Sequence, residues 1–141
     1  MPTTYVLCPS QRLVRSRAFG VLTEAESWAH YTGLSEDPEF HPTFRQLCDL
    51  SEVTELEASS QFLRDLARKS VFATGTRRAF VAPTALQFGL ARMLQVFCDL
   101  EGSEVGVFLS EEEAEAWLGL NDRADGSDAD AAPEQSEGVT P

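Results

Sequence analysis

The residues best placed for chemistry are Glu57-Ala58-Ser59-Ser60, which stand directly before a predicted helix. Apolar residues recur at helical spacing behind them, at Phe62, Leu63, Leu66 and Ala67. The hydroxyl of Ser59 or Ser60 can cap this helix by accepting a free backbone N–H. A strand is predicted just before, at residues 44–50, and loops at the carboxyl ends of strands carry function in open α/β sheets. We therefore predict a binding site at Glu57, Ala58, Ser59 and Ser60.

Other reactive side chains form weaker patterns. His30 and His41 are the only histidines, and neither stands in a Ser–His–carboxylate or Cys–His motif, although triad members can converge from distant segments. Asp37, Glu39 and Asp49 could converge as paired carboxylates, but capping of a loop and of a strand end explains them equally well. No metal-ligand spacing and no phosphate-binding glycine pattern is present. The sequence predicts a protein that is not an enzyme and needs no metal or cofactor.

Basic side chains offer a further candidate site. Arg15 and Arg17 share strand parity, and Arg45, Arg77 and Arg78 could join them in one cluster. Such a cluster could bind an anionic headgroup, although arginines along a solvated sheet edge are the commoner case.

Length and charge limit the class of protein. A chain of 141 residues is the size of one domain, and its net charge of −12 argues against binding to nucleic acid or to an anionic membrane surface. No apolar run has the length of a membrane span or a signal peptide. Three widely spaced cysteines, Cys8, Cys48 and Cys98, are expected to be small buried hydrophobes. We expect a soluble, cytoplasmic protein.

The carboxyl-terminal residues differ in composition from the rest. Residues 121–141 are rich in Asp, Glu, Ala, Ser and Gly and contain no aromatic residue, so this segment has too little apolar surface to offset its ordering entropy. We predict one domain over residues 1–120 and a disordered acidic tail over 121–141.

Strand and helix patterns alternate through the predicted domain. Two strands joined by a turn come first, and three strand–helix pairs follow the first helix, in the order β-β-α-β-α-β-α-β-α. The expected strands are residues 3–8, 13–22, 44–50, 77–82 and 104–109. Three capping boxes open helices, at residues 23–26, 84–87 and 110–113. The fold class is α/β, with a mixed, mostly parallel sheet of about five strands and four helices.

Several helix ends and faces also follow from the pattern. The first helix is expected to end near Gly33, with a loop over residues 34–42. The helix after Thr84 is expected to reach about Phe97 and to be largely buried, because its apolar stripe is wide (Leu86, Leu90, Leu94 and Phe97, with Phe88 and Met93 beside it). The last helix should dock on the core through Trp117, Leu118 and Leu120.

This sequence resembles the STAS fold, the sulphate-transporter and anti-sigma-factor-antagonist domain. Residues 49–60, Asp-Leu-Ser-Glu-Val-Thr-Glu-Leu-Glu-Ala-Ser-Ser, align without a gap with the STAS pattern Asp-Leu-Ser-x-Val-x-Phe-(Ile/Met)-Asp-Ser-Ser-Gly. The closer similarity is to the SpoIIAA-like subgroup of small bacterial proteins, which is related in fold to CRAL-TRIO lipid-binding domains. The resemblance covers nearly all of the predicted domain. It also rests on segments 37–40, 44–50, 78–83, 88–93, 105–108 and 115–118.

The resemblance implies two functions. The first is a non-catalytic regulatory or protein-interaction module with a protein partner; the second is a carrier or sensor of a small apolar ligand or lipid. In anti-sigma-factor antagonists the second Ser of Asp-Ser-Ser-Gly is phosphorylated, and that Ser corresponds to Ser59 here. Glu57, Ala58 and Ser60 depart from the motif, so an ordinary helix cap is the preferred interpretation of Ser59. The sequence leaves the partner, the ligand and the oligomeric state open, a homodimer included.

Overall fold

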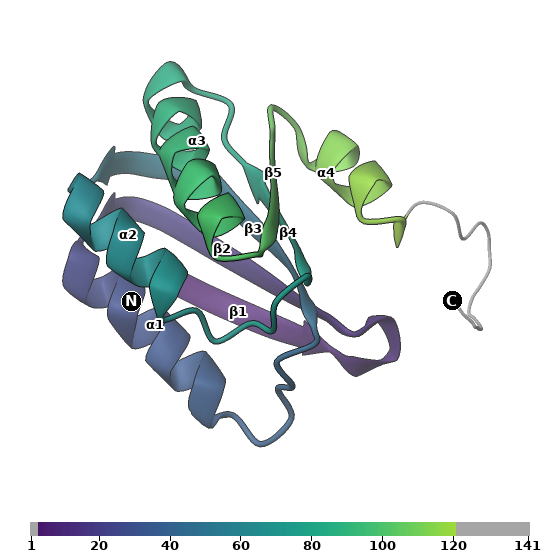
Figure 1. The fold of residues 1–141 in the computed structure, drawn as a ribbon. Helices are drawn as coiled ribbons and strands as arrows, with labels where there is room; N and C mark the ends of the chain where they lie inside the picture. The colour runs from purple at the N-terminus through teal and green to yellow at the C-terminus, as the bar shows by residue number, and fades with distance from the viewer. Residues whose placement is uncertain (1–2, 121–141) are drawn as a thin grey trace.

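The computed structural model describes residues 3–120 of the chain. The predicted acidic tail, residues 121–141, lies outside the described residues, so the domain boundary stays a prediction. Within residues 3–120 the chain forms a five-stranded sheet in the order β1-β2-β3-β4-β5, drawn in Figure 1. The strands are β1 (Thr3–Cys8), β2 (Leu13–Leu22), β3 (Arg45–Leu56), β4 (Arg77–Val81) and β5 (Glu104–Phe108), and the α-helices are α1 (Glu24–Glu36), α2 (Ser60–Arg68), α3 (Ala85–Leu100) and α4 (Glu111–Trp117).

The sheet is mixed and mostly parallel. β1 pairs antiparallel with β2 through the turn at Pro9–Gln11, whereas β2, β3, β4 and β5 are parallel neighbours. The α/β class, the element order and the antiparallel first pair are therefore confirmed. Neighbours in the sheet follow the order of the chain, so no reversal of strand order opens a crevice at the carboxyl edge of this sheet.

Two helix starts follow the sequence closely because capping contacts are local. The Thr23 hydroxyl accepts the Glu26 N–H at 3.2 Å, and Glu26 returns the contact to the Thr23 backbone. Thr84 and Gln87 form the same reciprocal pair at the start of α3. At α4 the Ser110 hydroxyl accepts the N–H of Glu113, and no return contact from the Glu113 side chain is present.

Three element boundaries differ from the prediction by three residues or more. β3 continues to Leu56, so most of the expected loop is strand. Its polar side chains face solvent while Leu50 and Val53 are buried, and its pairing with β2 contains two register shifts. α1 runs through Gly33 to Glu36 because Leu34, 0% exposed, packs against the core. α3 extends beyond Phe97 to Leu100.

The expectation that α3 is largely buried is wrong. Its buried residues are Gln87, Ala91, Leu94 and Cys98, whereas Leu86 is 55% and Met93 39% exposed. The Gln87 amide donates to the Val53 carbonyl at 2.8 Å, which satisfies a buried polar pair and directs this side of the helix at the sheet. The stripe was too wide for one contact surface, so part of it faces outward.

The two faces of the sheet carry different layers (Figure 1). α1, α2 and α3 cover one face, where the largest apolar cluster includes Cys48, Phe62, Phe80 and Leu94. α4 lies on the other face, over a smaller cluster with Leu13, Leu47, Ala79 and Val81 from the strands and Ala114 and Leu118 from the helical end. Leu118 and Leu120 are buried as expected, and Trp117 packs against the cluster while half-buried.

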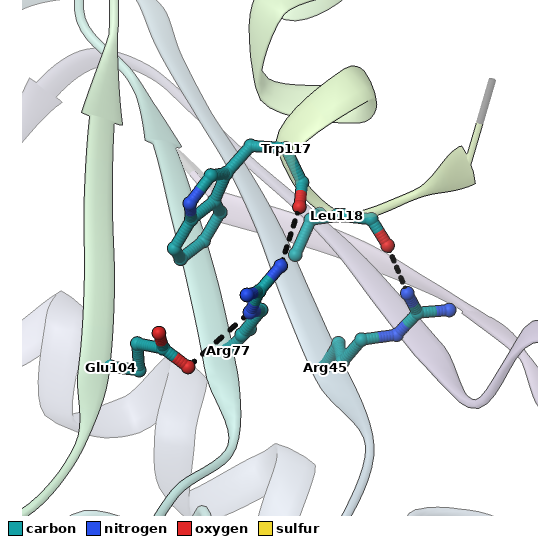
Figure 2. A network of polar contacts seen from close by, with 5 residues as sticks. All are labelled: Arg45, Arg77, Glu104, Trp117 and Leu118. Carbon is teal, nitrogen blue, oxygen red and sulfur yellow. Dashed lines mark hydrogen bonds and ion pairs between the residues drawn. The ribbon is translucent and has the colours of Figure 1, made fainter. Parts of the chain in front are cut away.

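Two arginines hydrogen-bond to carbonyls at the carboxyl end of α4. Arg77 donates to the Trp117 carbonyl at 2.8 Å, and Arg45 donates to the Leu118 carbonyl; Figure 2 shows both contacts. Carbonyls at a helix carboxyl end lack partners within the helix and carry partial negative charge, so cationic donors stabilise them. Arg77 also contacts Glu104 and lies over the Trp117 ring, 4.9 Å from its centroid.

Candidate functional site

The predicted binding loop, Glu57, Ala58, Ser59 and Ser60, joins β3 to α2. Ser59 is the N-cap: its hydroxyl accepts the Phe62 N–H at 3.1 Å, and α2 begins at Ser60. The loop is fastened to the start of α1, since the Glu24 carboxylate accepts the Ser59 N–H at 2.8 Å and the Glu57 carboxylate accepts the Glu24 N–H at 3.2 Å. The structure brings the loop together with α1 and accounts for Ser59 as a cap.

This geometry bears on the phosphorylation hypothesis. A phosphate on Ser59 would need free N–H groups and positive charge near the start of α2. The Ser59 N–H is already bonded to the Glu24 carboxylate, and Glu57 places a second carboxylate beside it. Phosphorylation of Ser59 therefore stays a prediction, and its immediate surroundings are acidic.

An apolar pocket lies between the sheet and helices α1, α2 and α3, with about 70 Å³ of free volume. It is partly open to solvent, and Leu56 and Ala58 of the β3–α2 connection form part of its wall. Other wall residues come from the sheet and all three helices, among them Leu22, Leu50, Phe62, Leu66, Phe80 and Leu94. One end of the predicted loop is thus the edge of a pocket. The sequence resemblance implied an apolar ligand as an alternative, but no residue spacing located this pocket, because it forms between segments far apart in the chain.

One corner of the pocket is polar. Ser16, His30 and Tyr31 all line the wall, and the Ser16 hydroxyl lies 3.0 Å from His30 Nε2. Ser16 also accepts from the Gln46 amide at 3.1 Å. Burial lowers the pKa of His30 from 6.5 to about 4, so the imidazole is neutral at pH 7.

Behind this corner lies a buried arginine. Arg78 is 2% exposed; its Nε donates to Gln46 Oε1 at 3.0 Å, and its Nη2 donates to the Tyr31 hydroxyl at 3.2 Å. The guanidinium carbon lies 4.6 Å from the Phe72 ring centroid and 5.5 Å from that of Phe80. Within residues 3–120 no carboxylate forms an ion pair with Arg78. Amide, phenol and aromatic faces hold the charge in place of a counter-ion.

The Ser16–His30 contact resembles a nucleophile–base pair, but its surroundings do not suit catalysis. A general base works best with a pKa near the working pH, and burial holds the pKa of His30 near 4. Ser16 is 4% exposed and accepts a hydrogen bond from Gln46. Among the hydrogen bonds of the described chain, no carboxylate accepts from the His30 ring, which a triad would require.

The five arginines that the sequence offered as a basic cluster do not form one cluster. Arg15 bonds Glu111 and Glu115, and Arg17 bonds Glu52. Arg45 and Arg77 bind the end of α4, while Arg78 lies on the opposite face. The predicted basic cluster is thus divided between two faces, and Arg15, Arg17 and Arg77 pair with carboxylates.

Two of the three candidate carboxylates, Asp37 and Asp49, have local roles. Asp37 accepts the Glu39 N–H at 2.9 Å and the Tyr5 hydroxyl at 2.8 Å in the loop before β3. Asp49, inside β3, accepts the Ser51 N–H at 2.9 Å. The contacts of Asp37 match the loop-capping alternative, whereas Asp49 is not a strand-end cap, because β3 continues to Leu56. Within residues 3–120 no group of three or more His, Cys, Asp or Glu side chains could hold a metal ion.

Two thiols are buried as expected. Burial raises the pKa of the Cys48 thiol to about 12 and also raises the pKa of Cys98. Both therefore stay protonated at neutral pH, which disfavours nucleophilic chemistry. Cys8 is half-buried.

Comparisons with known proteins agree with this architecture. An uncharacterized protein of the DUF3478 family from Shewanella loihica PV-4, which has a SpoIIAA-like fold, is similar over 82% of this chain and 93% of its own, with a TM-score of 0.54 and 21% identity. The chain has a SpoIIAA-like fold. A scan of protein-family models finds no match, and a search of curated proteins finds none. A similarity at this identity establishes the fold and leaves function to the site.

The SpoIIAA-like fold was expected from the sequence resemblance, and the structure adds its layers and its pocket. None of the helices in residues 3–120 has both the length and the apolar composition needed to cross a bilayer.

Proposed function

We propose that this SpoIIAA-like domain is a non-catalytic regulatory module that binds a small apolar molecule between its sheet and helices α1–α3. The pocket carries the proposal: its wall is nearly all apolar, it is partly open, and it reaches the β3–α2 loop. Ligand sites are usually apolar hollows with a few polar groups that orient the ligand. Occupancy could be transmitted to a partner because Ala58 lines the pocket while its neighbours Glu57 and Ser59 are exposed.

The size of the pocket limits the ligand. A dry cavity of about 150 Å³ accommodates benzene in another protein, whereas this pocket offers about 70 Å³. A short alkyl chain fits such a space, with the rest of the ligand extending through the opening. A carboxylate inside the apolar part would be costly to desolvate, so we expect a ligand whose buried part is neutral.

The polar corner supplies one specific contact. The Tyr31 hydroxyl accepts from Gln46 and Arg78, and no acceptor for its own hydrogen is found among the described residues. Tyr31 is one of the wall residues of the pocket, and we propose that it donates this hydrogen to a ketone, ether or alcohol oxygen of the ligand. Buried donors without an acceptor carry a free-energy cost that such a ligand would remove.

The test is a two-dimensional NMR titration with 2-pentanone, pentane and pentanoate, which share chain length and differ in the polar group. We expect shifts confined to residues around the pocket, with the ketone binding more tightly than the alkane or the carboxylate. Ala91→Leu fills the pocket from α3 and should abolish binding, because Ala91 is 4% exposed and lines the wall. The matched control Ala85→Leu makes the same change at an exposed position of α3 and should bind normally.

Native mass spectrometry of protein purified from its own host would identify a ligand that copurifies. The absence of pocket-centred shifts for all three probes, together with ligand-free protein from the host, would contradict the proposal.

A protein-interaction role through the loop is the second candidate. Glu57, Ser59 and Ser60 are exposed at the carboxyl edge of the sheet, where a partner can reach them. A partner that binds equally well to wild type and to the pocket-filled Ala91→Leu variant would favour this role over ligand sensing.

A further inference from the structure

The outward face of α3 carries an unpartnered apolar stripe. Leu86 is 55%, Met93 39%, Val96 56% and Leu100 77% exposed. With Gly89 these residues follow the alternating three- and four-residue spacing of a coiled-coil seam. They lie on the side of α3 away from its buried residues, because the sheet contacts come from Gln87, Ala91, Leu94 and Cys98. Figure 1 shows α3 as an outer helix beside β5.

We propose that this stripe is a homodimer interface, in which α3 packs antiparallel against α3 of a second copy about a two-fold axis. The axis passes between Met93 and Val96, so each Met93 meets the Val96 of the other copy. A two-fold interface must be complementary to itself, which is a strong demand on a stripe of this length. Both the shape and the charge of α3 satisfy that demand.

The shape matches at the ends of the stripe. In the register centred between Met93 and Val96, Leu100 of one copy lies opposite Gly89 of the other. Leu100 is the most exposed of the large apolar side chains. Beside Gly89 no heavy atom beyond its own helix backbone and chain neighbours lies within 4 Å of the place where a Cβ would stand. The largest projection therefore meets the one position of the stripe that has no side chain.

The charges match in the same register. Arg92 and Asp99 flank the stripe on one side, seven positions apart, which is one heptad. In an antiparallel pair such flanking positions face each other, so Arg92 of each copy meets Asp99 of the other. On the opposite flank the half-buried Leu90 meets Phe97 of the second copy. The register chosen by Leu100 and Gly89 is therefore also the register that pairs opposite charges.

The expected dimer is weak. A single helix-to-helix contact buries less than the roughly 800 Å² per partner of a standard interface. The net charge of −12 on each chain adds repulsion between the copies. We expect a dissociation constant in the range of about 10 μM to 1 mM.

Sedimentation equilibrium from about 10 μM to 1 mM protein tests the interface. Wild type should shift from monomer to dimer over this range, and Val96→Glu should stay monomeric, because a carboxylate at the centre of the seam would meet its own copy. Leu109→Glu is the matched control: Leu109 is 58% exposed and Val96 56%, but Leu109 lies outside the stripe, so this variant should still dimerise. Circular dichroism checks that each variant is folded.

A charge exchange tests the partner and the register together. Arg92→Asp or Asp99→Arg alone should weaken the dimer about tenfold, since each places like charges opposite each other. The double variant with both changes should recover most of the wild-type affinity, which only a second copy in this antiparallel register can explain.

A monomer at every concentration, a dimer that survives Val96→Glu, or a double variant as weak as the single ones would each overturn the proposal. The inference is independent of the proposed ligand, because neither variant set changes the residues that orient it.

Discussion

The two faces of the sheet are held by different means. On the face covered by α1, α2 and α3, Arg78 is almost completely buried and is bound by an amide, a phenol and aromatic rings. On the face covered by α4, its neighbour Arg77 is half-exposed and contacts Glu104 and a helix-end carbonyl. Adjacent residues of the same type thus have opposite environments, because successive side chains of a strand point to opposite faces.

The two faces of the sheet are therefore expected to have different roles. The three-helix face contains the pocket and its polar corner, and the charge of Arg78 is enclosed there with no carboxylate partner among residues 3–120. The α4 face is only partly covered, and its ion pairs Arg15–Glu111, Arg15–Glu115 and Arg17–Glu52 are partly or largely exposed to solvent. Exposed ion pairs contribute little to stability. Binding is therefore expected on the first face, and changes on the second should affect stability alone.

The largest effect is expected from the two adjacent arginines. Arg78→Ala should lower the free energy of unfolding by about 3–5 kcal/mol, because it leaves a cavity and removes donors from Gln46 and Tyr31. Arg77→Ala, the matched control on the other face, should cost about 1 kcal/mol or less. Urea denaturation measures both. Equal losses would show that the two faces do not differ in the way described.

The two tryptophans provide the next comparison. Trp117→Ala should cost about 2–3 kcal/mol, because half-buried Trp117 packs on the α4 face and loses less contact than a fully buried residue. Trp28→Ala removes an edge-to-face contact with Phe62, 5.7 Å between ring centroids, next to the pocket wall. We expect Trp28→Ala to weaken 2-pentanone binding and Trp117→Ala to leave it unchanged, as measured by NMR titration. An unfolding midpoint unaffected by Trp117→Ala would mean that α4 does not dock as described.

His30 should make the three-helix face sensitive to pH. Burial lowers its pKa from 6.5 to about 4. At pH values between 4 and 6.5, His30 is therefore protonated in the unfolded chain and neutral in the folded chain. Its contribution is fully present above pH 6.5 and is lost as pH falls toward 4, by about 3 kcal/mol.

His30→Gln should remove this loss, because glutamine does not titrate and can still hydrogen-bond Ser16. The measurement is urea denaturation of wild type and variant at several pH values from 7 down to 4, so that titration of the carboxylates cancels in the difference. A difference that stays constant with pH would contradict the low pKa of His30.

The smallest effects are expected at the loop that borders the pocket. Ser59→Ala removes the N-cap of α2 and should cost about 1 kcal/mol, whereas Ser59→Asp keeps a capping oxygen and should change the free energy of unfolding little. If Ser59 is a phosphorylation switch, a partner captured from host lysate by wild type and Ser59→Ala should be lost with Ser59→Asp. Identical partners for all three folded proteins would leave Ser59 as a cap only.

Much of the fold could be predicted because the responsible interactions are local. The caps at Thr23 and Thr84 join residues three positions apart, and alternating apolar residues identified the strands. Errors arose where distant contacts prevailed: Leu34 extended α1 past Gly33, and pairing with β2 extended β3 to Leu56.

The candidate site was only partly predictable. The loop from Glu57 to Ser60 was located, and Ser59 was identified as a cap, from the sequence alone. The pocket corner and the arginine behind it were missed because Ser16, His30 and Arg78 come from three separate elements, and no spacing in the sequence joins them. The one available signal was the Arg77-Arg78 pair itself, since a strand must place two adjacent arginines on opposite faces.

The sequence by itself thus determined the order of the elements, the helix starts and the α/β class, because backbone periodicity and capping act over a few residues. Only the tertiary structure decided which arginine is buried, which part of the α3 stripe faces outward, and where the pocket lies. These features depend on which segments pack together, and that choice is made by the burial of the whole sheet rather than by any short stretch of the chain.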